Sequence, residues 1–278
     1  MRVQIAAMFF SLMLAGCSQV FFQPNRVQVL TPGKLGLAYE EVRFGSTDGL
    51  ELYGWFLPAV GKAAGTVLFL HGNAENISTH IVSVAWMPAR QFNVFIFDYR
   101  GYGASQGKPT FGGVQQDIDA AMRTLLARMD IDTNRIVVFG QSLGGSLAVY
   151  YVAHTPFRDR IRALVIDSAF SSYTGIAREK LAATWLTWPF QWLASLAIDE
   201  RFSPLPAIAS ISPTPVLIIQ GDRDTIVPPH HAKRLYEAAA EPKQLWMVPQ
   251  AGHIQALSDE TQRDRLVNYL RQAFISDK

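Results

Sequence analysis

Two kinds of hydrophobic pattern divide the chain, and they predict two kinds of strand. Residues 41–44 and 50–56 alternate apolar and polar side chains around the turn-forming segment 45–49 (GSTDG), which predicts an antiparallel hairpin. From Thr66 onward the apolar residues form short continuous runs, a pattern typical of strands that are buried on both faces of a parallel sheet. We expect such strands at 66–70, 94–97, 136–139, 163–166, 216–219 and 244–248.

Helical patterns separate these runs. Apolar side chains recur at one-face helical spacing in two stretches, which contain Val114, Ile118, Ala121, Leu125, Leu126 and Met129, and then Leu266, Leu270, Ala273 and Phe274. Alternation of strand and helix predicts an α/β fold, with a mostly parallel central sheet and helices on both faces. We expect residues 40–278 to form this domain.

Residues 171–212 interrupt the alternation. This segment contains no strand pattern, and it holds three of the six tryptophans. An insertion here commonly covers the carboxyl ends of the strands, where open α/β sheets bind ligands. We interpret the segment as a helical lid in which Trp185, Trp188 and Trp192 line an apolar substrate site. A pair of ordinary core-packing helices is the alternative.

The composition is that of a globular protein and narrows the choice of partners. The chain has 278 residues, of which 49% are hydrophobic, with 25 basic against 23 acidic side chains. Charge this close to balance offers no electrostatic basis for binding nucleic acid. The sequence does not indicate an oligomeric state.

The N-terminus has a pattern of its own. Arg2 precedes an apolar stretch at 5–14, which is too short to span a bilayer comfortably and predicts a secretory signal. The sequence that follows, Leu-Ala-Gly and then Cys17, resembles the lipobox of bacterial lipoproteins. The resemblance implies that residues 1–16 are a signal peptide and that 17–39 form a lipidated tether. An ordinary signal peptide, or a buried cysteine, is the alternative.

The lipobox resemblance also implies a location. Lipidated Cys17 would anchor the protein to a membrane of the bacterial cell envelope. The following residue is Ser18, which in enteric-type bacteria resembles a signal for the outer rather than the inner membrane. Because Cys17 is the only cysteine, the chain has no internal disulfide.

The pentapeptide 140–144 (GQSLG) carries the first candidate for chemistry. It lies between the predicted strand 136–139 and a helix of small residues, so Ser142 would sit in a tight strand-to-helix turn with its hydroxyl exposed. The helix N-terminus would stabilise developing negative charge. A second match, 103–107 (GASQG), runs into proline and glycines that predict a loop. We therefore expect the nucleophile to be Ser142 and not Ser105.

A serine nucleophile needs a base and an orienting acid. Asp224 and His253 each follow the carboxyl end of a predicted strand, and all three groups then share one edge of the sheet. Asp222 and Asp167 are alternative acids, but Asp224 lies further along its loop and can reach a histidine more easily. The other histidines near predicted helix ends are expected at the surface: His80, His154, His230 and His231.

The loop after the first buried strand can complete the site. Gly72 permits a turn that points backbone amides at the reacting group, and Leu143, directly after the nucleophile, supplies another amide. We expect the neighbouring His71 to hold this loop by hydrogen bonding, not to transfer protons.

Five blocks together carry a resemblance to a known family. They are 71–74 (HGNA), 98–105 (DYRGYGAS), 140–145 (GQSLGG), 221–228 (GDRDTIVP) and 252–253 (GH). In this order they resemble the α/β-hydrolase superfamily, in its serine-aminopeptidase-like (S33-type) branch, over residues 40–274. The resemblance implies Ser142 as nucleophile, Asp224 as acid and His253 as base, with backbone amides from Asn73 and Leu143. It carries no substrate signature.

These inferences predict a serine hydrolase of the esterase, lipase or thioesterase type. It would cleave esters or thioesters of small or lipid-like apolar acyl substrates through an acyl-enzyme. No cofactor is needed, and the adjacent His230 and His231 lack the spacing of metal ligands. A peptidase is the alternative, with Glu179, Asp199 or Glu200 binding a substrate ammonium group. A lipoprotein that binds ligands without catalysis is a third hypothesis.

Overall fold

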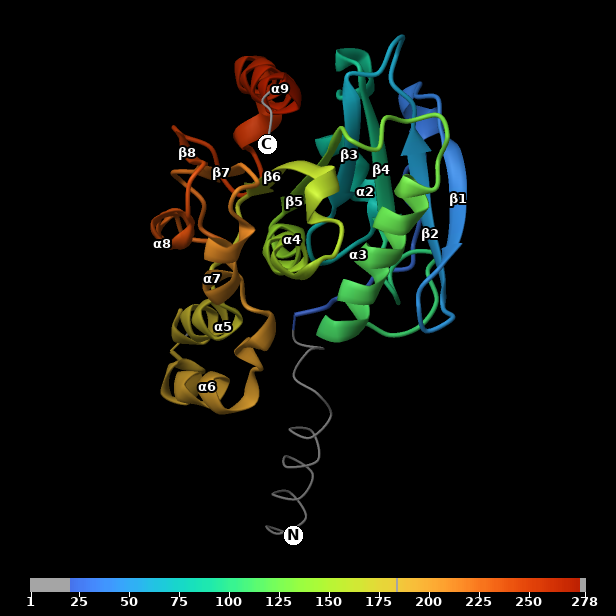
Figure 1. The fold of residues 1–278 in the computed structure, drawn as a ribbon. Coiled ribbons are helices and arrows are strands. Elements are labelled where there is room, and N and C mark those ends of the chain that lie inside the picture. Colours follow the sequence, from blue (N-terminus) through green and yellow to red (C-terminus); the bar gives the residue numbers. More distant parts are fainter. Residues whose placement is uncertain (1–20, 184, 276–278) are drawn as a thin grey trace.

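The structure is a computed structural model and describes residues 21–183 and 185–275. The described residues form one eight-stranded sheet in the order β1-β2-β4-β3-β5-β6-β7-β8 (Figure 1). Its strands are β1 (Glu40–Gly45), β2 (Glu51–Leu57), β3 (Gly65–Leu70), β4 (Phe92–Asp98), β5 (Ile136–Gln141), β6 (Ile161–Asp167), β7 (Val216–Gly221) and β8 (Lys243–Val248).

The strand pairing follows the two hydrophobic patterns. β1 and β2 form the predicted antiparallel hairpin, and β2 also pairs antiparallel with β4. The remaining neighbours, from β4 through β3 to β8, are parallel. All six predicted continuous runs are strands of this parallel part, so the predicted fold class is confirmed.

Helices cover both faces of the sheet (Figure 1). The α-helices are α2 (Ile77–His80), α3 (Phe111–Leu126), α4 (Leu143–His154), α5 (Tyr173–Ala182), α6 (Ala194–Ala197), α7 (Pro204–Ala207), α8 (His230–Ala238) and α9 (Glu260–Ile275). Short 3₁₀ helices are η2 (Pro32–Leu35), η3 (Ile81–Ser83), η4 (Pro88–Arg90), η5 (Arg158–Arg160), η6 (Trp188–Leu193), η7 (Glu200–Phe202), η8 (Ile208–Ile211) and η9 (Ala256–Ser258). One core packs α3, α4 and α8 on the sheet, and a second core packs α2 and α9.

One member of the predicted helical stripes is misplaced. α3 ends at Leu126, and the side chain of Met129 is 98% exposed. Just beyond the helix, Arg128 pairs with Glu40 of β1 and with Asp130 of the following loop. The contact with Glu40 joins residues 88 positions apart in sequence, so helical periodicity could not reveal it.

The segment predicted as a lid leaves the sheet after β6 and returns at β7. It contains α5, η6, α6, η7, α7 and η8, and its described residues include no strand. Figure 1 shows α5 and α6 projecting beyond the sheet, with α6 outermost. The predicted helical character is confirmed.

The predicted signal peptide, Cys17 and Ser18 lie outside the described residues. The described part of the predicted tether packs on the domain, where Phe21 and Phe22 are buried in the core. Asn76 Nδ2 donates hydrogen bonds to the carbonyls of Asn25 and Val27, at 3.0 and 2.8 Å. Within 21–183 and 185–275, none of the helices has the length and apolar character needed to cross a membrane.

Candidate active site

Ser142 lies at the sharp turn between β5 and α4. Its backbone adopts φ 53° and ψ −118°, a strained conformation for a residue with a side chain. The flanking glycines allow the turn because a Cβ on Gly140 would lie 2.3 Å from the carbonyl oxygen of Gly144, and one on Gly144 would lie 2.1 Å from that of Leu70. Only glycine fits where these backbones meet.

Three side chains from separate loops form one hydrogen-bonded chain at this turn. His253 Nε2 lies 3.0 Å from Ser142 Oγ, and His253 Nδ1 lies 2.8 Å from Asp224 Oδ2. The structure thus brings together the three residues that the order along the chain singled out. In this geometry the imidazole can accept the serine proton while the carboxylate holds its other nitrogen in the protonated form.

The Asp224 carboxylate is buried and well supplied with donors. Its Oδ1 accepts backbone N–H bonds from Ile226 and Val227 at 2.9 and 2.8 Å, and its Oδ2 also accepts from Gln220 Nε2 at 3.0 Å. Burial alone would raise its pKa, but the hydrogen bonds from His253 and the two backbone groups outweigh burial and lower the pKa. Asp224 therefore stays ionised beside the histidine.

The loops that carry Asp224 and His253 touch each other. A Cβ on Gly221 would lie 2.3 Å from the carbonyl oxygen of Ala251, and that oxygen accepts the N–H of Arg223 at 3.0 Å. The residue after His253 is held as well, because Ser168 Oγ accepts the N–H of Ile254 at 3.0 Å. These contacts fix the position of the imidazole relative to its acid.

Sequence reasoning missed two of these supports, Gln220 and Ser168. The only feature of the sequence that could have indicated a role for Gln220 is that a polar residue stands at the end of a buried strand. Ser168, which has φ 56°, directly follows Asp167, but nothing in the pattern relates it to residue 254.

The loop after β3 lies against the nucleophile. A Cβ on Gly72 would come within 3.5 Å of the Cβ of Ser142. Asn73 follows, and its Oδ1 accepts from Tyr102 Oη and from the N–H of Gln23, both at 2.9 Å. Leu143 is the first residue of α4, so its N–H has no acceptor within the helix. Leu143 thus directly follows Ser142, and Asn73 directly follows the glycine that approaches it and is tied to the N-terminal segment through Gln23.

His71 supports this loop from beneath. Its ring is buried and stacks on Tyr99 with ring centroids 4.2 Å apart, while Nδ1 contacts the carbonyl of Gly72 at 2.8 Å. Tyr99 Oη donates to the carbonyl oxygen of His71 at 3.0 Å. Burial lowers the pKa of His71 well below its ordinary value, so the ring is neutral at pH 7. These contacts agree with the supporting role expected for His71.

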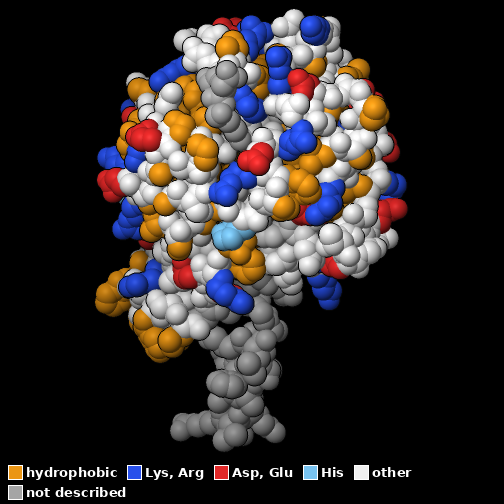
Figure 2. All heavy atoms as spheres, viewed as in Figure 1, with side chains coloured by type: hydrophobic (Ala, Val, Ile, Leu, Met, Phe, Trp, Pro, Cys, Tyr) orange, Lys and Arg blue, Asp and Glu red, His pale blue; other side chains and the backbone are white. Residues whose placement is uncertain are grey.

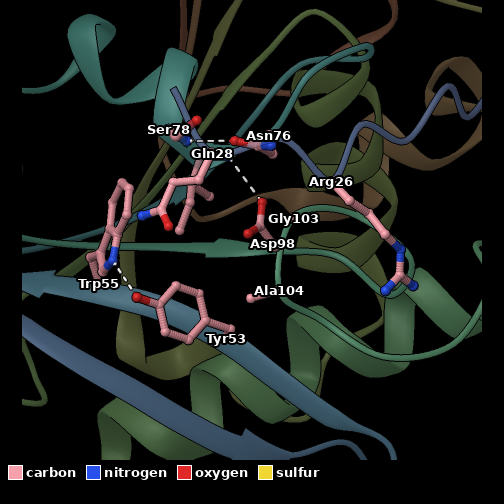
Figure 3. Close-up of a pocket in the computed structure, with 10 residues that line it drawn as sticks. Arg26, Gln28, Tyr53, Trp55, Asn76, Ser78, Asp98, Gly103 and Ala104 are labelled. Atoms are coloured by element: carbon pink, nitrogen blue, oxygen red, sulfur yellow. Dashed lines mark hydrogen bonds between the residues drawn. The ribbon is translucent and has the colours of Figure 1, made fainter. Parts of the chain in front are cut away.

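Ser105, the rival serine, is a buried structural residue. Its Oγ donates to the carbonyl of Asp98 at 2.6 Å and accepts the N–H of Tyr53 at 2.9 Å. Figure 3 shows a cavity lined by Ala104, its neighbour in the chain, and by Asp98, whose carboxylate accepts the N–H of Ile77 at 3.0 Å. This cavity of about 70 Å³ has room for a few water molecules, and none of the three linked side chains lines it.

The lid tryptophans point away from the core. The side chains of Trp185, Trp188 and Trp192 are 86%, 58% and 55% exposed. Their contact with substrate stays a prediction.

A cluster at the base of the lid could be mistaken for a metal site. Glu179 contacts His230 Nε2 at 2.9 Å and His231 Nε2 at 3.2 Å. His231 Nδ1, however, accepts the backbone N–H of Ser171 at 3.1 Å, so its neutral ring carries the proton on Nε2. That nitrogen donates to Glu179 and offers no lone pair to a metal. The expectation that His231 lies at the surface is wrong, because the ring is completely buried under α5.

The alternative acids have other partners. Asp222 Oδ1 accepts the N–H of Gln250 at 2.6 Å, near the surface. Asp167 is fully buried and accepts from Gln141 Nε2 and Ser168 Oγ at 2.9 and 3.1 Å. Burial raises the pKa of Asp167 to about 6, against the effect of these hydrogen bonds. Neither carboxylate bonds to His253, so the preference for Asp224 agrees with the geometry.

The raised pKa of Asp167 predicts a stability effect. The folded state holds this proton up to about pH 6 and the unfolded state only to about pH 4. Asp167 therefore makes its full contribution to the free energy of unfolding below pH 4. This contribution falls by about 3 kcal/mol as the pH rises to 6. We expect Asp167→Asn to remove this component from urea unfolding curves measured between pH 4 and 7. Equal pH dependence in the variant and the parent would contradict the assignment.

Comparison with known proteins agrees with the fold. A family model described as serine aminopeptidase, S33, matches residues 61–211, and one described as the alpha/beta hydrolase fold matches residues 179–260. The first of these covers more than half of the chain. The chain belongs to the α/β-hydrolase superfamily.

Relatives of this superfamily member cover most of its length. The uncharacterized protein YfhR of Escherichia coli (strain K12) is 38% identical over 241 residues, or 84% of this chain and 81% of YfhR. The alpha/beta hydrolase domain-containing protein WAV2 of Arabidopsis thaliana is 38% identical over 220 residues, covering 76% and 70%. An esterase structure from Pyrococcus furiosus superposes with a TM-score of 0.69 at 26% identity, covering 90% of this chain and 99% of the esterase.

Proposed function

We propose that this α/β-hydrolase cleaves carboxylic esters or thioesters of apolar acyl groups, with Ser142 as nucleophile. The observation that carries the proposal is the hydrogen-bonded chain from Ser142 through His253 to Asp224. The esterase among the similar structures supports an ester substrate. An intact set of nucleophile, base and acid has no purpose in a protein that only binds ligands.

The chemistry follows from the hydrogen bonds. His253 Nε2 takes the proton of Ser142 as Oγ attacks the acyl carbon, and the backbone amides of Asn73 and Leu143 stabilise the oxyanion. The leaving alcohol or thiol departs with the proton from His253, and an acyl-enzyme remains. Water then attacks the acyl carbon, again losing a proton to His253, and the carboxylic acid is released as the Ser142 hydroxyl re-forms.

The contacts of the lid carboxylates favour an ester over a peptide substrate. An aminopeptidase needs an available carboxylate for the substrate's ammonium group. Glu179 contacts two histidines, Asp199 pairs with Arg201 at 2.6 Å, and Glu200 accepts from Ser172 Oγ at 3.1 Å. All three candidates for ammonium binding are thus already engaged.

The location of the enzyme is part of the proposal. We propose that lipidated Cys17 anchors it to a membrane of the bacterial cell envelope, with Ser18 directing it to the outer membrane in a Gram-negative cell. Incorporation of radiolabelled palmitate into the parent, and its loss in Cys17→Ala, tests this anchor.

Two assays test the reaction. A fluorophosphonate probe is expected to label the parent protein and not Ser142→Ala. A panel of p-nitrophenyl esters of increasing chain length, assayed beside aminoacyl p-nitroanilides, is expected to show turnover of the esters. Turnover of the anilides alone would identify a peptidase, and absence of Ser142-dependent labelling would exclude a serine hydrolase.

A further inference from the structure

The outer part of the lid exposes large apolar side chains. We define the lid tip by six of them: Trp185, Leu186, Trp188, Phe190, Trp192 and Leu196. Each is more than half exposed, and η6, which carries three of them, contains no buried residue. Figure 2 shows apolar side chains gathered at the end of the molecule where α6 lies. Contiguous apolar surface of this kind marks an interaction site.

The lid tip is exposed although the base of the lid is attached to the rest of the domain. Ser203 Oγ accepts the N–H of Tyr173 at 3.1 Å at the start of α5, and Glu200 accepts from Ser172 Oγ at the same distance. Further along α5, Glu179 contacts both histidines at the start of α8. The base is therefore held by polar contacts, and the tip projects from a fixed support.

The N-terminal segment meets the lid at this base. Phe21, the first described residue, packs edge-on against Tyr173 with ring centroids 5.0 Å apart, and it also contacts Phe111 and Phe170. Cys17 lies four residues before Phe21 in the sequence. Even a fully extended chain spans only about 14 Å over four residues, so chain length limits how far a group attached at position 17 can be from Phe21. An acyl anchor on Cys17 would therefore bring a bilayer surface to the lid.

We propose that the lid tip inserts into the lipid–water interface of the membrane that holds Cys17. Tryptophan prefers this interface because its ring is apolar and its N–H is polar, and phenylalanine and leucine can enter the acyl region below it. Lys and Arg side chains lie beside the apolar surface (Figure 2), and they suit anionic headgroups. This contact with the membrane goes beyond the proposed reaction. It depends on the proposed lipidation of Cys17 only because that anchor brings the membrane within reach of the lid.

This orientation has a consequence for the site. The lid leaves the sheet after Asp167, whose carbonyl oxygen accepts the N–H of Ser142 at 2.9 Å. The nucleophile therefore lies at the sheet edge from which the lid projects.

Tryptophan fluorescence tests the proposal. The full chain, produced in a bacterium that processes lipoproteins, is placed in phosphatidylethanolamine–phosphatidylglycerol vesicles with and without phospholipids brominated in their acyl chains. An interfacial helix lies ~5–10 Å deep, so we expect membrane binding to shift the tryptophan emission to the blue and brominated lipid to quench it. Because three of the six tryptophans are in the lid, up to about half of the emission should be lost. The triple variant Trp185→Phe, Trp188→Phe, Trp192→Phe should lose this quenching, while Trp86→Phe should retain it.

Each outcome decides the question. If the protein floats with the vesicles but its emission is the same with and without brominated lipid, the proposal is overturned. It is also overturned if the protein does not float with the vesicles. Protection of the lid tryptophans from acrylamide without lipid, together with a doubled mass, would identify a second copy as the partner instead. Ser142→Ala should be quenched like the parent, so failure of the proposed reaction remains distinguishable from failure of the lid contact.

Discussion

Replacement of Ser142 by alanine is expected to lower kcat for ester hydrolysis on the order of 10⁶-fold. The variant loses the atom that forms the acyl-enzyme, and His253 is left without the hydroxyl that its Nε2 contacts at 3.0 Å. Residual rate would come from oriented amides and bound water. Stopped assays on a short p-nitrophenyl ester, with active-site titration of the parent, provide the measurement.

The fold should tolerate this change. The positive φ at position 142 has to be adopted by serine in the parent and by alanine in the variant, and the substitution removes a single oxygen atom. The thermal midpoint is therefore expected to stay close to that of the parent. Loss of activity together with unfolding would leave the role of Ser142 in turnover unsupported.

Ser105→Ala is the matched control because Ser105 lies in the other G-x-S-x-G match. Its Oγ bonds to Asp98 and Tyr53 within the core, so the variant should lose about 1–3 kcal/mol of stability. The rate per folded molecule should change little. A large loss of kcat in Ser105→Ala, with Ser142→Ala active, would reverse the assignment of the nucleophile.

Replacement of Asp224 by asparagine is expected to lower kcat on the order of 10⁴-fold. The Oδ1 position accepts two backbone N–H bonds, so the new carboxamide must keep its oxygen there. Its NH₂ group then faces His253 Nδ1 and donates to it. The proton of His253 moves to Nε2, which can no longer accept the proton of Ser142.

Asp222→Asn is the control for this second variant. Asp222 lies two residues away, is exposed, and accepts one N–H from Gln250, which an asparagine oxygen can also accept. We expect its kcat to stay within about threefold of the parent, as for other surface substitutions. Steady-state kinetics on the same ester compare the two variants. If Asp222→Asn were the inactive one, the acid would be misassigned.

Much of the fold could be predicted from local patterns. A strand buried on both faces needs apolar side chains at every position, so the runs that became β3 to β7 are visible without any partner strand. The hairpin of β1 and β2 is equally local, because alternation and a glycine-rich turn specify it. Met129 was misplaced because α3 ends at Leu126, and the periodicity of apolar residues does not show where a helix ends.

The candidate site was predictable for a different reason. Ser142, Asp224 and His253 each follow a parallel strand, and the carboxyl ends of parallel strands meet at one edge. Their distances could not be predicted, since these depend on close backbone approaches such as that of Gly221 to Ala251. The roles of Gln220 and Ser168 depend on the same approaches.

The sequence by itself determined the fold class, the order of the chemical groups and the edge of the sheet that they share. These properties follow from side-chain periodicity and chain connectivity, which are local. Only the tertiary structure decided that residues 21–29 run along the loop of Asn73, that His231 is buried beneath the lid, and that the lid tip faces outward. Such contacts join segments tens of residues apart, and many pairings satisfy the same local pattern until the packed core selects one.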